Sequence, residues 1–407
     1  MTTFDALLRQ SQLMSKKVHA MAVEKSVRGT LRDSEPSPAD AVDFVVFFAD
    51  GPGQSYQLEQ WTAPFEALQD RGYGVCLVVM NALSARLLAQ RTRLPIYLSR
   101  SMERIEAALA SWGTSGIFYV NNSQVNFTML RISGPAHVHL SHGESEKSSM
   151  VSNQLKAYDY AFIAGQVAQS RIMESIPRID PAALVQIGRP QLDITVPGAP
   201  ARPPGSRTKV LYAPTWEGDG KNMAYTSVIS VGAKLVEALL ADERFTVVFR
   251  PHPKTGSWSA KARHELAHIQ RAMGTAAAKE PKAGHRVEMS GDSSRSIVDA
   301  DIVLCDISAM AMDAIGLDKP LLLLHSADTR MIRELAPEQS LSLEQAGKLL
   351  QGREKELLDT IASLGGAQPS GQQRSLRAKV FGDPALGSAT ERFIAASIAV
   401  TGPDGQR

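Results

Sequence analysis

His142 follows a strand-like alternating run at 137–141, and Glu144, Glu146 and Lys147 come directly after it. A carboxylate beside an imidazole raises its pKa and orients the ring, which suits a general base. A histidine that only closes a turn could carry the same neighbours. The choice between these interpretations depends on which residues stand at the ends of the other predicted strands.

Cationic and polar groups follow two strands later in the chain. Arg250 and His252 lie in "RPHP", after the apolar run 245–249, where a guanidinium can fork onto phosphate oxygens and an imidazole adds a donor. Ser308 follows the run 302–305 as the expected N-cap of a helix, and the free N–H groups of a helix start bind phosphate. The structural alternatives are a charged turn and plain helix capping.

The first predicted strand, 42–50, is followed by a glycine-rich turn with Gly51 and Gly53. Tyr56 opens the next helix, where it could line a site or pack in the core. Because parallel strands end at one edge of a sheet, all these groups should converge on one cleft. The sequence therefore predicts a binding cleft rather than isolated polar turns.

Short apolar runs alternate with helix-length patterns from residue 42 onward, which predicts βαβ units and parallel sheets. We expect an α/β protein with two Rossmann-like, doubly wound domains that face each other across a cleft. The predicted parts are a basic amphipathic helix at 1–35, an N-terminal acceptor-side domain at 36–194, a Pro/Gly-rich linker at 195–208, a nucleotide-donor domain at 209–355, and a tail at 356–407 with a helix that crosses back to the N-terminal domain.

The composition is that of a globular protein, with 43% hydrophobic and 21% charged residues in 407. A formal net charge of +2 argues against a nucleic-acid partner. Cys76 and Cys305 sit in apolar runs and are expected to be buried and reduced, and no run approaches the ~20 apolar residues of a membrane span. These features predict a cytoplasmic protein.

The first 32 residues carry six basic and two acidic side chains on a helical apolar pattern. Such a helix can lie on the inner face of an anionic membrane as a peripheral contact. It can equally pack on its own domain with a solvated basic face, and the sequence leaves both open.

No metal or cofactor is expected. His137, His139 and His142 stand at i, i+2 and i+5, which is a weak zinc signal without a second ligand cluster. The chain has no Walker A sequence, and "GPGQSY" lacks the third glycine of a dinucleotide fingerprint.

In their order, "HGESEK" (142–147), "GRPQLD" (188–193), "YAPTW" (212–216), "RPHP" (250–253) and "DISAMAMD" (306–313) resemble the motifs of the CDP-glycerol glycerophosphotransferase family. The resemblance implies a two-domain GT-B fold and transfer of glycerol phosphate from CDP-glycerol, or a related CDP-polyol, to a polymer or lipid-linked acceptor, with release of CMP, as in teichoic acid synthesis.

The resemblance also implies roles for single residues. His142 would be the base, in a catalytic group with Glu144 and Lys147. Gly51, Gly53 and Tyr56 would lie on the acceptor side. The donor and its diphosphate would be held by Thr215, Arg250, His252, Asp306, Ser308 and Asp313.

Three positions depart from the family pattern: Glu144 replaces Thr, Gln191 replaces Arg and Ala309 replaces Ser. Two alternatives therefore stay open. One is a nucleotide-sugar glycosyltransferase or epimerase, in which Glu217 and Asp313 would contact sugar hydroxyls. The other is a nucleotide-binding protein that has lost its activity.

Overall fold

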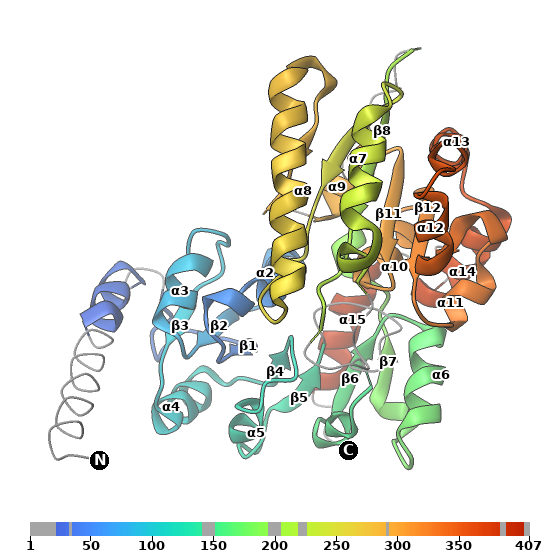
Figure 1. The fold of residues 1–407 in the computed structure, drawn as a ribbon. Helices are drawn as coiled ribbons and strands as arrows, with labels where there is room; N and C mark the ends of the chain where they lie inside the picture. Colours follow the sequence, from blue (N-terminus) through green and yellow to red (C-terminus); the bar gives the residue numbers. More distant parts are fainter. Residues whose placement is uncertain are drawn as a thin grey trace, which may run out of the picture.

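The computed structural model of the chain describes residues 22–31, 35–140, 151–193, 205–218, 226–289, 293–382 and 388–402. Two parallel sheets with interleaved helices form the molecule (Figure 1). This arrangement confirms the predicted α/β class with two Rossmann-like units. Within the predicted N-terminal helix, residues 22–31 are helical, whereas 1–21 and most of the predicted linker lie outside the described residues.

The first sheet has seven strands in the order β3-β2-β1-β4-β5-β6-β7. Chain order reverses at β1, which pairs in parallel with both β2 and β4, so this is a topological switch point. The strands are β1 Phe44–Phe48, β2 Val75–Val79, β3 Ile96–Leu98, β4 Gly116–Tyr119, β5 Ala136–His139, β6 Tyr160–Ile163 and β7 Leu184–Gln186.

Side chains of β1 alternate between two apolar layers because successive residues of a strand point to opposite faces. Phe44, Val46 and Phe48 pack in one cluster and Val45 and Phe47 in another. Both faces are therefore covered, as a parallel sheet requires. The helices of this half are α2 Tyr56–Asp70, α3 Ala82–Leu88, α4 Met102–Trp112, α5 Asn126–Met129 and α6 Gln166–Ser175.

The second sheet has six parallel strands in the order β10-β9-β8-β11-β12-β13. Its switch point lies at β8, which pairs with β9 and with β11. The strands are β8 Thr208–Ala213, β9 Phe245–Phe249, β10 Arg286–Val287, β11 Ile302–Asp306, β12 Leu321–His325 and β13 Ser340–Ser342.

Helices also cover both faces of the second sheet. None of the helices in the described ranges is long and apolar enough to cross a membrane. Residues Val228–Gly232 form a single π-helical turn that runs into α7. The helices are α7 Ala233–Ala241, α8 Ala260–Lys279, α9 Ser293–Asp299, α10 Ala309–Gly316, α11 Arg330–Glu334, α12 Leu343–Leu349, α13 Glu354–Gly365, α14 Gly371–Phe381 and α15 Ala389–Thr401.

The last helix, α15, packs on the first sheet although it comes after the second in the chain (Figure 1). Its Phe393 is fully buried, and its ring centroid lies 5.2 Å from that of Phe65 on α2 and 6.2 Å from that of Phe118 on β4. The C-terminal helix is therefore part of the core of the N-terminal half.

The structure adds elements that the apolar runs do not indicate. β3, β10 and β13 have two or three residues each, too few to show an alternating pattern. Helix α13 packs Leu357 and Ile361 into the core of the second half, so this core extends beyond residue 355. Short edge strands and peripheral helices depend on tertiary packing more than on local pattern.

Candidate active site

Asp306, at the end of β11, organises the carboxyl edge of the second sheet. Its buried carboxylate accepts hydrogen bonds from the backbone N–H of Thr215 at 2.8 Å and of Ser227 at 3.1 Å. Tyr212 bonds the Ser227 hydroxyl at 2.7 Å, which fixes the same turn. Asp306 and Thr215 therefore shape the loop after β8 from within.

Arg250 comes directly after β9 at this edge. Its guanidinium donates to Ser296 Oγ at 3.2 Å and lies 3.5 Å from Glu288, which also pairs with Arg286 at 2.7 Å. Burial acts to raise the pKa of Glu288, but the Ser296 hydrogen bond and the two guanidinium groups outweigh it, so the pKa is lowered. The carboxylate of Glu288 thus lies between the guanidinium groups of Arg250 and Arg286.

His252 lies where the two halves meet. Its Nδ1 accepts the Lys254 backbone N–H at 3.1 Å, which leaves Nε2 as the protonated nitrogen of the neutral ring. The ring centroid lies 6.1 Å from that of Trp216, nearly parallel, and 6.1 Å from that of Tyr56 of the first half, edge-on. Lys254 lies over Trp216, with Nζ 5.2 Å from the ring centroid. His252 is thus held in place by both halves of the molecule.

Glu217 has a structural part beside this histidine. Its buried carboxylate accepts backbone hydrogen bonds from Gly256 at 3.0 Å and from Trp258 and Ser259 at 2.9 Å. Burial acts to raise its pKa, but these bonds outweigh burial, so the pKa lies below its usual value. With its oxygens used in this way, Glu217 anchors the loop 251–259 rather than serving a ligand hydroxyl.

Ser308 is the N-cap of α10, where the sequence predicts it. Its hydroxyl donates to the carbonyl of Asp306 at 3.0 Å and makes no capping bond to α10. The N–H groups that open α10 therefore lack the side-chain acceptor that a serine N-cap usually supplies. A helix start in this condition suits an anion.

Asp313, farther along α10, has a partner in the first half of the molecule. Both of its oxygens accept hydrogen bonds from Arg189, which lies after β7; Nη2 donates to Oδ2 at 3.0 Å, and Nε donates to Oδ1. Both side chains are buried. In this arrangement Asp313 joins the halves, and contact with a ligand would compete with that ion pair.

The carboxyl edge of the first sheet carries a polar network that the motifs in the sequence do not predict. Asn121, after β4, donates from Nδ2 to Asp50 and to Gln57, both at 2.9 Å. Gly51 and Gly53 lie in the turn between Asp50 and α2, as predicted. The signal available in the sequence is an asparagine directly after a buried strand.

Tyr56 comes to the cleft from α2. Burial raises its pKa, while a hydrogen bond from Gln57 acts in the opposite direction. The phenol therefore stays protonated at neutral pH and can donate a hydrogen bond. The Tyr56 ring contacts that of His252, so a predicted acceptor-side residue lies next to a predicted donor-side residue.

The predicted catalytic group, His142, Glu144 and Lys147, lies outside the described residues, which end at Leu140 before resuming at 151. His137 lies in β5 as a structural residue: Nδ1 accepts from the Tyr119 hydroxyl at 2.7 Å, and Nε2 donates to the Ile132 carbonyl at 2.9 Å. Among the described residues, no group of three His, Cys, Asp or Glu side chains is arranged to hold a metal.

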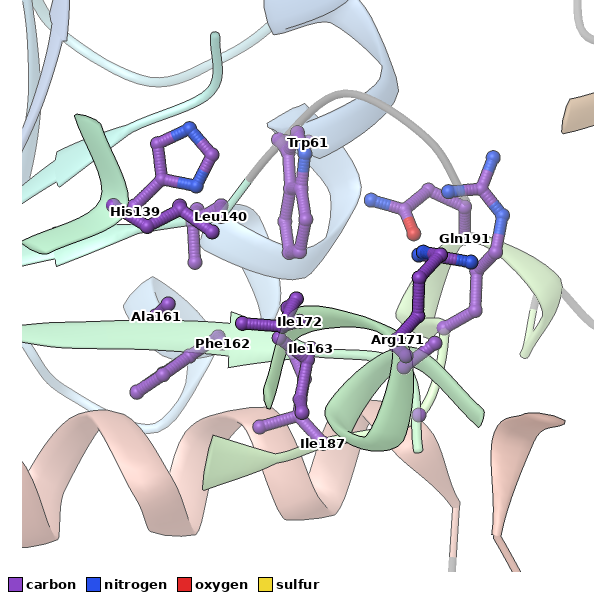
Figure 2. A pocket seen from close by; sticks show the side chains of 15 residues that line it. Trp61, His139, Leu140, Ala161, Phe162, Ile163, Arg171, Ile172, Ile187 and Gln191 are labelled. Atoms are coloured by element: carbon purple, nitrogen blue, oxygen red, sulfur yellow. The ribbon is translucent and has the colours of Figure 1, made fainter. Parts of the chain in front are cut away.

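A pocket of about 50 Å³ opens at the carboxyl ends of β5 and β6, next to Leu140. Figure 2 shows His139 at one end of it, Gln191 and Arg171 at the other, and Ile172 between them. Gln191 is one of the residues that depart from the family pattern, which has an arginine at this position. It is buried, and within the part of the chain that the structure describes neither its Oε1 nor its Nε2 has a hydrogen-bond partner.

The sequence matches the family described as CDP-Glycerol:Poly(glycerophosphate) glycerophosphotransferase over residues 118–380. No curated protein is similar enough in sequence to count as a relative.

Several solved structures share the fold. MnaA from S. aureus with UDP has a TM-score of 0.56 at 14% identity, over 88% of this chain and 96% of that one. A UDP-N-acetylglucosamine 2-epimerase candidate from Listeria monocytogenes has a TM-score of 0.55 at 16% identity, with the same coverage. A variant of the wall teichoic acid polymerase TagF, soaked with CDPG, has a TM-score of 0.54 at 14% identity, over 98% of this chain and 99% of that one. These likenesses confirm the GT-B fold.

Proposed function

Because the chain belongs to the CDP-glycerol:poly(glycerophosphate) glycerophosphotransferase family, we propose that it transfers glycerol phosphate from CDP-glycerol to a hydroxyl of a cell-envelope polymer or lipid-linked acceptor. A related polyol phosphate is included in this proposal. TagF, a wall teichoic acid polymerase, has the same fold, which supports teichoic acid synthesis as the setting. The family match over residues 118–380 is the observation that carries the proposal.

In the proposed reaction, the acceptor oxygen attacks the glycerol-side phosphorus of CDP-glycerol. A new P–O bond forms, the bond from that phosphorus to the bridging oxygen breaks, and the bridging oxygen leaves on CMP. The hydroxyl proton passes to His142 as the base, which is worth ~10²–10⁴-fold in rate.

The donor diphosphate would lie against the carboxyl edge of the second sheet. Arg250 and the Nε2–H of His252 would donate to its oxygens, and the start of α10 at Ser308 would add backbone N–H groups. These donors are held in advance by Glu288, Trp216 and Asp306. Groups fixed before the reaction stabilise the charge that develops on CMP without further reorganisation.

The acceptor would approach from the first half of the molecule, past Tyr56 and the turn with Gly51 and Gly53. The described chain leaves β5 at this edge, two residues before His142. Glu144 and Lys147 would orient the base and balance its charge. A lipid-linked acceptor would place the reaction at the inner face of the cell membrane.

The test is release of CMP from CDP-glycerol with a glycerophosphate or membrane-lipid acceptor, measured for wild type and His142→Ala. We expect acceptor-dependent release that falls at least ~10²-fold in the variant. His264→Ala, on α8, is the matched control and should keep wild-type activity. Binding of CDP-glycerol without release of CMP in the presence of any acceptor would contradict the transferase. Turnover of UDP-sugars instead would identify a different donor.

A further inference from the structure

Gln191 is a buried amide with unsatisfied hydrogen-bonding capacity. The residue is 6% exposed, and neither of its amide atoms has a hydrogen-bond partner among the described residues. A buried amide without partners lowers the stability of the folded protein, so native proteins rarely keep one without a reason. Gln191 lines the pocket at the ends of β5 and β6, and its amide points toward the pocket (Figure 2), so a partner of the amide would bind there.

The amide sets what the partner must offer. Oε1 accepts and Nε2 donates, and a hydroxyl group matches both, since it has one donor and two acceptor lone pairs. A phosphate oxygen or a carboxylate would satisfy Nε2 but leave Oε1 facing another acceptor. The pocket is therefore suited to a neutral hydroxyl.

The other walls indicate a carbon skeleton with that hydroxyl. Ile163, Ile172 and Trp61 give the pocket an apolar wall, and Arg171 brings a guanidinium to the end occupied by Gln191 (Figure 2). Its volume of about 50 Å³ exceeds the ~10–15 Å³ that a single water needs. At about 50 Å³ the pocket can take the hydroxyl-bearing end of a short polyol, with an attached phosphate outside it, and this end fits the combination of apolar wall, amide and cation.

The pocket lies where the two halves of the chain meet. Ser294 of α9 donates to the backbone carbonyl of Gln191 at 3.5 Å, and the neighbouring Arg189 pairs with Asp313 of α10. Gln191 is therefore held by the second half while its side chain faces a pocket of the first. A ligand here would form hydrogen bonds with an amide whose position depends on both halves.

We propose that this pocket binds the terminal polyol unit of a substrate and that Gln191 recognises one of its hydroxyls. The inference rests on the proposed function, because the polyol would be the glycerol unit of the acceptor or of CDP-glycerol. Gln191 is then a specificity-determining residue that does not take part in proton transfer.

Gln191→Met tests this, since methionine keeps the length of the side chain and removes both polar atoms. The matched control is Gln186→Met, on the exposed end of β7, where the glutamine bonds to Gln169. KM for acceptor and for CDP-glycerol, and the Tm without substrate, are measured for all three proteins. Binding of sn-glycerol 3-phosphate alone is measured by calorimetry.

We expect one KM to rise about tenfold in Gln191→Met, from the loss of one buried hydrogen bond, with Tm unchanged or higher. A rise in the acceptor KM assigns the pocket to the acceptor, and a rise in the CDP-glycerol KM assigns it to the donor. If the KM values and the affinity for glycerol phosphate both stay unchanged while Tm falls, the proposal is overturned, because Gln191 would then be structural.

Failure of the proposed function has a different signature. Wild-type protein that releases no CMP refutes the transferase, while the calorimetry still tests the pocket. Wild-type binding of sn-glycerol 3-phosphate that Gln191→Met loses would support the polyol site in that case, and equal binding or no binding by both proteins would overturn it.

Discussion

Arg189 and Asp313 form a buried, bidentate ion pair between the two halves of the molecule. Arg189 lies after the last strand of the first sheet, and Asp313 lies on α10, which opens beside the proposed diphosphate site. A fork of two hydrogen bonds fixes orientation as well as distance. The pair therefore holds α10 in a defined position relative to the first sheet.

Asp313→Ala should lower the free energy of unfolding by about 3–5 kcal/mol, because it leaves the Arg189 guanidinium buried without its partner. The Arg189→Met, Asp313→Leu double variant should recover much of that loss, since no charge then remains buried. Urea denaturation measures both.

The control is the exposed pair Arg330–Glu174, at 3.2 Å, which also joins the two halves. Glu174→Ala should cost under about 1 kcal/mol, as solvent screens this pair. Equal losses of unfolding free energy at the buried and exposed pairs would show that Asp313 does not hold the two halves together.

The ends of the strands were predictable, while the partners of their side chains were not. Apolar runs such as 302–305 identify buried strands by composition alone, and Ser308 at the N-cap is indicated by its position before a helical pattern. Nothing local indicates that Asp313 meets Arg189, 124 positions away along the chain. Local sequence therefore favours a ligand contact for Asp313, whereas the fold gives it an ion pair.

Glu217 shows the same limit. A carboxylate after a predicted strand has the chemistry of a ligand contact, but its three backbone partners come from a loop about 40 positions further along the chain. Gln191 appears in the sequence only as a departure from a family pattern. Its unsatisfied amide becomes visible when β5, β6 and the turn after β7 are brought together.

Glu217 should make stability depend on pH. Its pKa is lowered in the folded protein, so its contribution to stability is fully present above the unfolded-state pKa of ~4.3 and is lost as the pH falls through the lower folded-state value. Unfolding free energies at several pH values between 7 and 3 measure this for wild type and Glu217→Gln.

The Glu217→Gln variant should be less stable at pH 7 and should lose less stability on acidification. The glutamine NH2 group would face either the backbone N–H of Gly256 or those of Trp258 and Ser259. In both cases donor faces donor, so hydrogen bonds are lost. Parallel pH curves for the two proteins would mean that Glu217 does not carry the dependence. Glu106→Gln, on the exposed face of α4, is the control carboxylate.

Arg250→Ala should raise KM for CDP-glycerol by about tenfold to a hundredfold, because charge-assisted hydrogen bonds are worth ~1.5–3 kcal/mol. Arg250→Lys should recover part of the loss, since lysine keeps the charge but not the fork. Steady-state kinetics at saturating acceptor give both values, and Tm shows whether the loop with Glu288 is intact.

Arg244→Ala is the matched control. Arg244 lies at the start of β9 rather than its end, where it pairs with Asp242 and Asp359. Its KM for CDP-glycerol should equal that of wild type. A similar KM for Arg250→Ala and wild type would remove Arg250 from the donor site.

Phe393 tests whether the C-terminal helix is essential to the N-terminal core. The ring is fully buried among Trp61, Phe65 and Phe118, with centroids 5.2–6.2 Å apart. Phe393→Ala should lower the unfolding free energy by about 3–5 kcal/mol, through lost apolar burial and the cavity left behind. Ile398→Ala, on the exposed face of the same helix, should change it by about 0.5 kcal/mol. Equal small effects would mean that α15 is only loosely attached to the first sheet, whereas the expected difference shows that the first half cannot complete its core until the last helix has been added.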